Sequence, residues 1–363
     1  SSDLWGNAIR VGIFGESHGS EIGVVLDGLP AGVAIDLDFI SAEMLRRAPG
    51  HDLLATQRKE DDVPKILSGV KDGYTTGTPL ACTIENTNKR SQDYDSFLRP
   101  GHADWTARIK YGKFADVAGG GHFSGRITAP LVFAGAVAKL ILAEKGIRVF
   151  ARIRSVGTVT DDMDVMGVLL DFETIQNLIK ISQKGFPASE QFEKAFQEEI
   201  KQAMASSDSV GGTIEVIAAG ALAGLGEPFF GSLESVLASL YFSIPAVKGV
   251  EFGKGFALSA MRGSASNDPL YVNAGKIYSK TNQCGGVLGG ISNGMPIVAR
   301  VAIKPTASIH LPQETVDGDP PENVTAVIRG RHDPCIVPRA VPVVEACTAL
   351  GLLDLFLMNA GRK

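Results

Sequence analysis

Residues that could carry out acid–base or anion chemistry collect in a few glycine- or proline-rich loops of this sequence. The loops are 15–19 (Gly-Glu-Ser-His-Gly), 99–104 (Arg-Pro-Gly-His-Ala-Asp), 119–130 (Gly-Gly-Gly-His-Phe-Ser-Gly-Arg-Ile-Thr-Ala-Pro), 304–308 (Lys-Pro-Thr-Ala-Ser) and 329–335 (Arg-Gly-Arg-His-Asp-Pro-Cys). Histidine changes its charge near neutral pH, and arginine and lysine bind phosphate and carboxylate groups through charge-assisted hydrogen bonds. The loops therefore offer proton transfer beside anion binding.

The 119–130 loop carries the strongest single signal for an anion site. Three glycines precede an apolar segment, so backbone N–H groups and the positive end of a helix would face a bound phosphate. The loop is not a Walker loop, since it lacks Gly-Lys-Ser/Thr, and it has no G-x-G-x-x-G ahead of a recognisable βαβ unit. His122, Ser124 and Arg126 add an imidazole, a hydroxyl and a cation. We therefore expect this loop to bind an anion.

Each of the other loops, taken alone, has a structural explanation. The 15–19 loop is not a G-x-S-x-G nucleophile elbow, and alone it would be a glycine turn with a hydrogen-bonded His18. Segment 99–104 alone would be a surface turn, and 329–335 a solvated charged loop. Arg46 and Arg47 stand where a helix must stop before Pro49, so the helix dipole explains them as isolated features.

The number of cations in these loops is the stronger argument. The chain is acidic, with a formal net charge of −5, which gives no sign of a nucleic-acid binder. The cations in or near the loops, close in sequence to every histidine except His310, are Arg46, Arg47, Arg58, Arg99, Arg126, Lys304, Arg331 and Arg339. If these loops share one cleft, the cleft is positively charged in an otherwise acidic protein. Such a cleft favours small polyanionic ligands, and we expect it to bind more than one of them.

Hydrophobic periodicity predicts the elements that must position these loops. Apolar residues at helical spacing predict amphipathic helices over 190–205 and 233–242. An apolar pattern on almost all sides predicts a deeply buried helix at 131–144, and a second long apolar helix is predicted at 343–357. Alternation at period two predicts half-buried strands at 80–84 and 297–303.

The two halves of the sequence resemble each other in the order of their elements. A strand, a glycine-rich turn and a helix at 23–46 have a counterpart at 213–242, and glycine-rich hairpins at 66–80 and 287–297 precede a basic loop and a long apolar helix. We interpret this as a duplication, although chance similarity between glycine-rich hairpins is the alternative. The prediction is an α+β fold, a layered α-β-β-α sandwich of two stacked antiparallel sheets with helices outside. Residues 1–363 form a single domain, with halves of roughly 1–150 and 205–363 and an insertion at about 155–190.

Composition excludes several classes of protein. Hydrophobic residues make up 44% and charged residues 21%, as in ordinary globular proteins, so disorder and collagen-like structure are excluded. Glycine is the one anomaly: 42 of the 363 residues are glycine, well above the usual share of roughly 7%. The four cysteines show no metal-ligand spacing, so we expect no metal site and a reduced, cytoplasmic protein. The best candidate for a membrane span, 131–143, contains Lys139 and is too short, so we expect a soluble protein.

Taken in order, the motifs resemble the chorismate synthase family. The resemblance rests on 15–19, 46–50 (Arg-Arg-Ala-Pro-Gly), 84–87 (Ile-Glu-Asn-Thr), 99–104, 247–253 (Val-Lys-Gly-Val-Glu-Phe-Gly), 289–294 (Gly-Gly-Ile-Ser-Asn-Gly), 304–308 and 331–335, which span nearly the whole chain. It implies a lyase that converts 5-enolpyruvylshikimate 3-phosphate to chorismate and phosphate by 1,4-anti-elimination, the last common step of the shikimate pathway to aromatic amino acids. It also implies a homotetramer and a need for reduced FMN without net oxidation, the flavin giving an electron transiently and taking up the ring hydrogen through N5.

The resemblance also implies roles for individual residues. His18 lies near the flavin ring, His102 protonates the departing phosphate as an imidazolium kept charged by neighbouring anions, and Asp333 helps to remove the flavin N5 proton. Ser17 and Ser124 place hydroxyls at the substrate. FMN contacts are implied at His122, Phe123, Ser124, Ala246, Gly289, Lys304, Pro305, Thr306, Ala307, Ser308 and Arg331, and substrate contacts at Arg46, Arg47, Arg58, Arg99 and Arg126.

The sequence departs from the family pattern at a few positions. His122 stands where much of the family has arginine, and Ile127 where it has glutamate, which changes the flavin contacts of this loop. Pro245 replaces an asparagine, and Leu53 replaces an arginine, which argues against a nicotinamide contact there. We recognise no added reductase segment and expect FMN to be reduced by an external NADPH-dependent source, a flavin reductase.

Two other classes of flavin protein remain as alternatives. A flavin oxidoreductase using NADPH for net redox chemistry would be expected to show a nicotinamide phosphate fingerprint, and none is recognisable. A non-catalytic flavin carrier needs neither three proton-transfer groups nor a cluster of arginines beyond the flavin phosphate.

Overall fold

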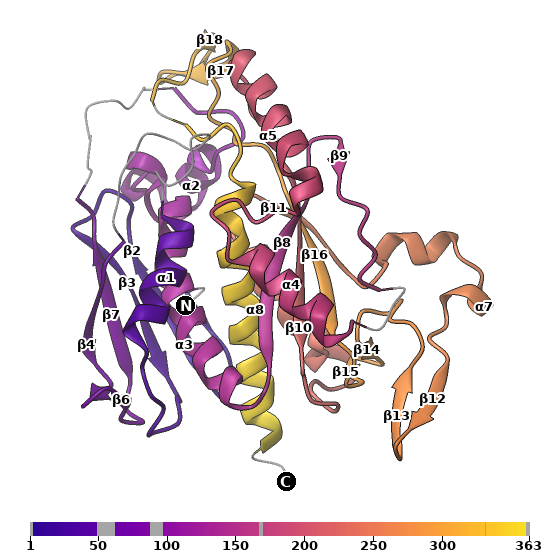
Figure 1. Cartoon of the computed structure of the whole chain (residues 1–363). Helices are drawn as coiled ribbons and strands as arrows, with labels where there is room; N and C mark the ends of the chain where they lie inside the picture. The colour runs from indigo at the N-terminus through magenta and orange to yellow at the C-terminus, as the bar shows by residue number, and fades with distance from the viewer. Residues whose placement is uncertain (1–2, 49–61, 88–96, 167–169, 331, 361–363) are drawn as a thin grey trace.

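Two five-stranded antiparallel sheets enclose a layer of helices (Figure 1). The computed structural model describes residues 3–48, 62–87, 97–166, 170–330 and 332–360. The first sheet has the order β1 (Leu4–Trp5), β2 (Arg10–Gly15), β3 (Glu21–Asp27), β7 (Leu80–Glu85) and β4 (Pro64–Ser68). The second has the order β9 (Val159–Thr160), β8 (Arg148–Val156), β10 (Gly212–Ala219), β16 (Ile297–Ile303) and β11 (Val247–Phe252).

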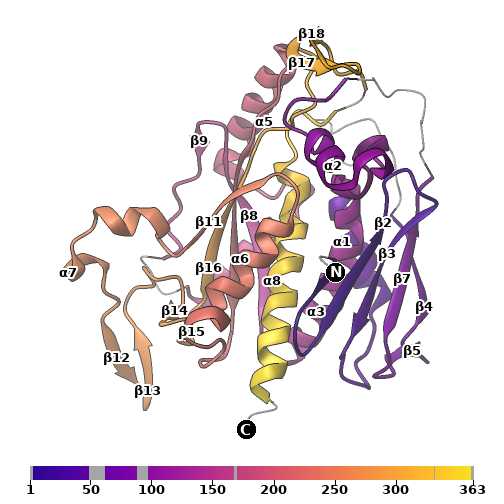
Figure 2. The ribbon, with the colours of Figure 1, turned by 180° about the vertical axis from the view of Figure 1, so that it is seen from behind.

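The helices between the sheets are α1 (Leu37–Arg47), α3 (Thr128–Glu144), α6 (Leu233–Ser243) and α8 (Val337–Ala360) (Figures 1 and 2). α3 packs on β2, β3 and β7, α8 packs on β8 and β10, and the two helices pack on each other. The mixed α+β class is confirmed, but the predicted α-β-β-α layer order is wrong. A helix that is apolar on all sides needs neighbours on all sides, and only the middle layer provides them.

Close contact between the central helices depends on a glycine. A Cβ at Gly135 of α3 would lie 2.2 Å from Cβ of Ala346 in α8. The C-terminal helix is also fastened to the first sheet through the buried carboxylate of Asp354. Its Oδ1 accepts hydrogen bonds from the backbone N–H groups of Asn7, Ala8 and Ile9, just before β2.

The strand order supports the proposed duplication. β2-β3-β7-β4 in the first sheet corresponds to β8-β10-β16-β11 in the second. Along the chain, α1 follows β3 and α6 follows β10, the second strand of each series. The long apolar helices α3 and α8 come after β7 and β16, the third strand of each series. β8 thus stands at the start of the second series, so that series begins well before residue 205.

The segment between β8 and β10 has no counterpart in the first series, where a short turn joins β2 to β3. It contains β9, α4 (Phe172–Ser182) and α5 (Glu190–Ala205), so it extends beyond the predicted insertion at 155–190. α4 covers part of the outer face of the second sheet, where its Leu178 and Ile181 belong to a small apolar cluster with Phe150.

Most elements expected from periodicity are present. α5 has the predicted bounds, α6 differs by one residue at its end, and β7 and β16 cover the predicted strands. Within the described part of the chain, two helical stretches, residues 125–144 and 337–360, are long and apolar enough to cross a membrane. Their most apolar windows are 72% and 83% buried, which is typical of core helices.

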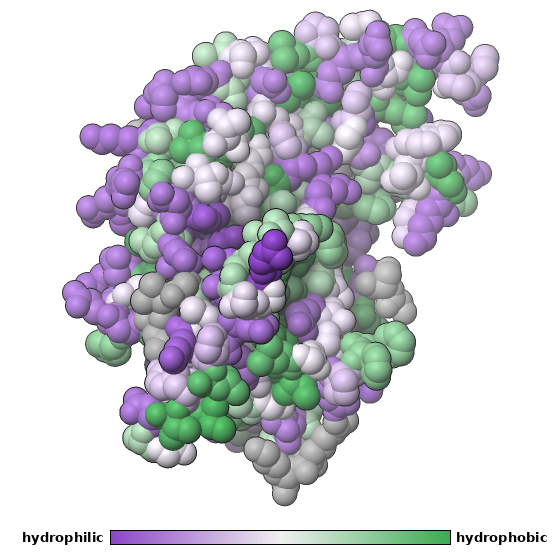
Figure 3. Space-filling model, turned by 90° about the vertical axis from the view of Figure 1, so that its right-hand side faces the viewer, coloured by the Kyte–Doolittle hydropathy of each residue, from purple (hydrophilic) through white to green (hydrophobic). Residues whose placement is uncertain are grey.

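The remaining elements are short. They are β5 (Val70–Lys71), β6 (Tyr74–Thr75), α2 (Asp104–Tyr111), η1 (Gly112–Phe114), η2 (Ala118–Phe123), η3 (Gly125–Ile127), η4 (Phe229–Gly231), η5 (Gly255–Ala260), α7 (Gly263–Ser266), β12 (Leu270–Asn273), β13 (Lys276–Ser279), β14 (Val287–Leu288), β15 (Ile291–Ser292), β17 (Gln313–Asp317) and β18 (Glu322–Ala326). The β12–β13 hairpin projects from the second half and exposes Leu270, Val272 and Ile277. Figure 3, which views this side, shows separate apolar patches on a mostly polar surface.

Candidate active site

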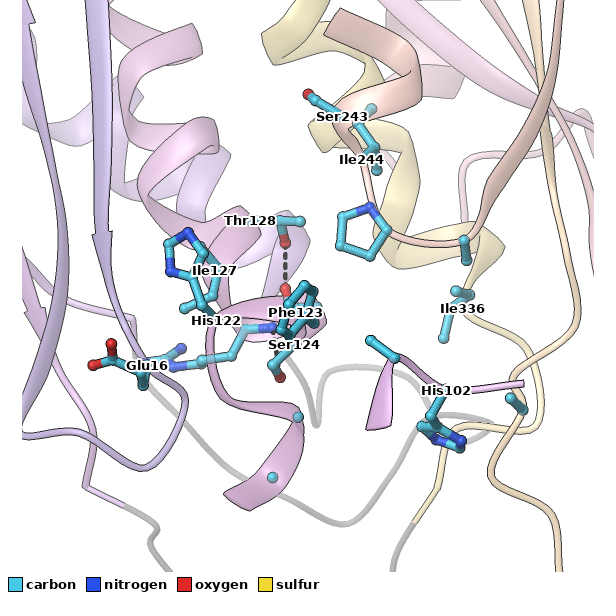
Figure 4. Close-up of a pocket in the computed structure, with 18 of the residues that line it drawn as sticks. Glu16, His102, His122, Phe123, Ser124, Ile127, Thr128, Ser243, Ile244 and Ile336 are labelled. Carbon is cyan, nitrogen blue, oxygen red and sulfur yellow. Dashed lines mark hydrogen bonds between the residues drawn. The ribbon is translucent and has the colours of Figure 1, made fainter. Parts of the chain in front are cut away.

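The predicted loops converge on one cavity of about 1780 Å³ where the two halves meet. Figure 4 shows Glu16, Phe123 and Ser124 of the first half facing the same space as Ile244 and Ile336 of the second. A pocket for one drug-sized ligand occupies about 300–1,000 Å³, so this cavity has room for two small molecules.

The loop after β2 is fastened to the glycine run of η2. The backbone N–H of Ser17 donates to the carbonyl of Gly121 at 3.1 Å, and its hydroxyl donates to the carbonyl of Gly119 at 3.0 Å. His18 lines the cavity and lies against Gly119, where a Cβ would come within 2.4 Å of the imidazole. The side chain of Ser17 is buried and is not part of the cavity wall, so the structure does not support a substrate contact for it.

The His122–Phe123–Ser124 segment lines the cavity as predicted. His122 Nδ1 donates to the carbonyl of Gly15 at 2.7 Å, so this departure from the family pattern ties the loop to the end of β2. The Phe123 side chain is exposed and presents an aromatic face. The hydroxyl of Ser124 caps η3 by accepting from the backbone N–H of Arg126.

Three of the predicted arginines line the cavity, each held by a carboxylate. Arg99 makes two hydrogen bonds to Asp104 through its side chain, at 2.8 and 2.7 Å. Arg47 and Arg126 share the carboxylate of Asp62. Burial lowers the pKa of Arg47 to about 10, although Asp62 opposes this change. The guanidinium groups are therefore oriented before any ligand binds.

His102 is held at both ring nitrogens. Nδ1 lies 3.0 Å from the carbonyl of Pro100, so Nδ1 carries a proton, and Nε2 lies 2.7 Å from the hydroxyl of Ser308. Burial, followed by the Arg99 cation, holds the pKa of His102 below its ordinary value, while Asp104 opposes them. The described neighbours alone therefore do not support the prediction that anions keep this imidazole charged, and it stays a prediction for the complex, in which a bound anion would raise the pKa.

The opposite wall comes from the second half. Asp333 accepts a hydrogen bond from Arg339, whose Nε donates to the backbone carbonyl of Arg47 at 3.1 Å. Lys304 donates to the carbonyl of Gly101 at 2.7 Å, which joins the two basic loops. Thr306 lines the cavity, and its buried Oγ1 has no hydrogen-bond partner among the residues that the structure describes, so one polar atom of this wall is left unsatisfied there.

Two further predicted contacts lie away from the cavity. Arg46 is in the last turn of α1 beside Arg47, but its guanidinium bonds Glu43, Glu345 and the carbonyl of Ser182. Lys139 joins this buried ion cluster between α1, α3 and α8, so Arg46 stabilises the helix layer and does not reach the ligand cavity. Gly289 lies in the β14–β15 turn and does not line the cavity. Arg58 and Arg331 lie outside the described residues.

The other residues predicted at the site, among them Asp333, Ala246 and those of 304–308, do line the cavity. Sequence reasoning missed Asp62, because nothing in the run Glu60-Asp61-Asp62 distinguishes one acid from the others. It also gave no role to Arg108, Lys110 or Tyr111, which line the cavity from α2. The basic residues follow the 99–104 motif, so the charge pattern there could have indicated them.

The cavity fits a flavin phosphate and ring on chemical grounds. Lys304 and the Thr306 hydroxyl, which lacks a partner within the described part of the chain, suit a phosphate, since a cation and a hydroxyl both donate to its oxygens. Phe123 and Ile244 (Figure 4), together with Ala246, offer apolar surface for an aromatic ring system.

Comparisons with known proteins agree with the family suggested by the motifs. A family model described as chorismate synthase matches residues 9–357. A chorismate synthase of Dehalococcoides mccartyi is 47% identical over 362 residues, covering 98% of this chain and 97% of that protein. One of Pyrococcus abyssi is 47% identical over 359 residues with the same coverage. A solved structure named "Crystal Structure of Chorismate Synthase" matches with a TM-score of 0.77 at 29% identity, covering 98% of this chain and 94% of that one.

Proposed function

Because this chain belongs to the chorismate synthase family and is a lyase of the chorismate-forming step of the shikimate pathway, we propose that its central cavity carries out that step with reduced FMN. The reaction is the 1,4-anti-elimination of phosphate from 5-enolpyruvylshikimate 3-phosphate. The substrate has two carboxylates and a phosphate, and FMN carries a phosphate of its own. These charges match a cavity lined by cations from both halves of an acidic chain.

The observation that best supports the proposal is the convergence of His18, His102 and Asp333 on the same cavity as Arg47, Arg99 and Arg126. These residues come from separate segments of the sequence, and a purely structural cluster would not need them around an open space. The arginines fixed by carboxylates supply oriented positive charge to an anionic group without reorganising during the reaction.

The residues around Phe123, Ala246 and Lys304–Ser308 would hold FMN, with Lys304 and Thr306 at its phosphate. Reduced FMN, when bound, supplies electron density for the departure of the phosphate and leaves no net oxidation. The role of the protein would be to hold the two ligands beside each other in the cavity and to limit the access of water to them.

His102 is the proposed proton donor to the departing phosphate. Its Nδ1 proton is fixed by Pro100, so Nε2 is the atom that exchanges protons, and the hydroxyl of Ser308 lies 2.7 Å from it. A hydroxyl can donate and accept at once, so Ser308 can pass a proton between Nε2 and a phosphate oxygen. His18 and Asp333 also line the cavity; with FMN bound there, His18 would polarise the flavin and Asp333 would accept a proton from it.

The wider expectations remain part of this proposal. We expect an external NADPH-dependent reductase to supply reduced FMN. A cytoplasmic location is supported by the burial of the two apolar helices and by four cysteines without disulfides. A homotetramer is supported by exposed apolar residues such as Phe229 and Phe230, whose side chains are 86% and 98% exposed.

An anaerobic assay tests the proposed function. The protein is mixed with dithionite-reduced FMN and 5-enolpyruvylshikimate 3-phosphate, and phosphate and chorismate are followed together. Equal amounts of both products, and none with oxidised FMN, are expected. Absence of phosphate release with reduced FMN would refute the proposal. In a parallel reaction with NADPH and oxidised FMN in place of dithionite-reduced FMN, stoichiometric NADPH consumption with net reduction of the product would favour the oxidoreductase alternative.

A further inference from the structure

A buried carboxylate holds together two of the arginines in the cavity wall. Asp62 is 3% exposed and is not itself part of that wall. Its Oδ2 accepts hydrogen bonds from Nε and Nη2 of Arg47, at 3.0 and 2.5 Å. Its Oδ1 accepts from Nη1 of Arg126. Each carboxylate oxygen therefore serves one arginine.

The remaining donors of both arginines fix the planes of the guanidinium groups. Arg47 Nη1 lies 3.3 Å from Thr128 Oγ1 at the start of α3. Arg126 Nε donates to Asn86 Oδ1 at 2.9 Å, and its Nη2 donates to the carbonyl of Glu85 at 3.0 Å. Asp62 thus connects the end of α1 to η3, and Arg126 extends the network to the end of β7 and to Asn86.

Without Asp62 this arrangement would lack its central acceptor. Both guanidinium groups bond the same carboxylate, and Arg126 is one of the cations that, after burial, lower the pKa of Arg47. The same two arginines hold the pKa of Asp62 below its usual value against the opposing effect of burial. The three groups therefore depend on one another for both charge and orientation.

We propose that Asp62 is a positioning residue, which holds Arg47 and Arg126 as an oriented pair for an anionic group of the substrate. The inference rests on the proposed function. It adds that the orientation of the pair, and not only its charge, contributes to turnover. Fixed donors of this kind stabilise developing charge without reorganisation, and small displacements of them are costly.

The variant Asp62→Asn tests the proposal, because net charge and the orientation of the arginines predict opposite effects on substrate binding and turnover. Asp62→Asn removes a negative charge behind an anion site, so long-range electrostatics predicts tighter binding of the anionic substrate and a lower KM. Loss of orientation predicts the reverse, because an amide presents one acceptor oxygen and an NH₂ group that faces a guanidinium donor. We expect kcat/KM to fall about 10- to 100-fold, with a lower kcat.

A double-mutant cycle tests whether Asp62 acts through the arginines. Asp62→Asn, Arg126→Lys and the double variant are compared by anaerobic steady-state kinetics. We expect Asp62→Asn to reduce kcat/KM much less in the Arg126→Lys background than in the wild-type background, because the group it positions is already impaired. Equal fold losses in the two backgrounds, or a lower KM with unchanged kcat in Asp62→Asn, would overturn the proposal.

A matched control and a second variant separate this role from folding. Asp161→Asn removes a similarly buried carboxylate that pairs with Arg152 away from the cavity, and it should lower Tm without lowering kcat/KM. Should Asp62→Asn fail to fold, Asp62→Glu carries the test, because it keeps the charge but displaces the carboxylate by one methylene. A wild-type kcat/KM in Asp62→Glu would overturn the positioning role. An inactive wild-type protein would instead refute the proposed function.

Discussion

Binding of the anionic substrate should cause the protein to take up a proton at His102. The free protein keeps this imidazole largely neutral at neutral pH, because burial and Arg99 lower its pKa below the ordinary value of about 6.5. A unit negative charge about 4 Å from Nε2, at an effective dielectric constant of about 20, stabilises the imidazolium by about 4 kcal/mol. That energy corresponds to a rise of about three pKa units.

Calorimetry measures the proton uptake directly. The substrate is titrated into protein with oxidised FMN, so that no turnover occurs, in buffers of different ionisation enthalpy at one pH near 7.5. We expect uptake of about one proton per bound substrate at this pH. The uptake should shrink at a pH above the pKa of His102 in the complex, where His102 stays neutral, and at a pH below its pKa in the free protein, where His102 is already charged. The His102→Asn variant should take up at least about half a proton less. Equal uptake by the two proteins would refute the assignment of His102 as the group charged by the ligand.

Three other substitutions test the site and the fold. Arg126→Lys should lower kcat/KM at least about tenfold, because the donors of an ammonium group share one nitrogen and cannot reproduce the planar fork that bonds three separate acceptors through Nε, Nη1 and Nη2; equal kcat/KM would contradict an oriented fork. Asp354→Asn should lower the free energy of unfolding by about 2–4 kcal/mol in a denaturant titration, since backbone donors at the N-terminal turn lose a charged acceptor; an unchanged midpoint would contradict this. Gly135→Ala should cost at least about 1–3 kcal/mol, because the added Cβ would overlap Ala346, and a wild-type Tm would show that the helices can separate.

Local patterns predicted the elements better than their arrangement. The spacing of Phe192, Phe196 and Ile200 is sufficient to define α5, because one face of that helix packs on protein and the other faces water. The same reasoning predicted that α3 is deeply buried and that α8 is a long apolar helix, but periodicity does not say which surfaces cover them. The choice between helices outside and helices between the sheets depends on long-range packing, so the layer order was missed.

Neighbouring residues at the site show a similar limit. Arg46 and Arg47 are both in the last turn of α1, but successive side chains on a helix point about 100° apart. One therefore enters the buried ion cluster, and the other lines the cavity. The charge of His102 depends on burial and on Arg99 at the same time, and the partner of Arg47 and Arg126 is an unremarkable aspartate. Such properties arise only when distant segments meet.

The most direct test of the central claim is turnover by the His102→Asn variant, measured anaerobically with reduced FMN beside its affinity for FMN. We expect chorismate and phosphate formation to fall about 10²–10⁴-fold, while the dissociation constant of FMN changes by less than about threefold. Wild-type turnover in this variant would contradict the claim that His102 supplies the proton to the departing phosphate in the cavity between the two halves.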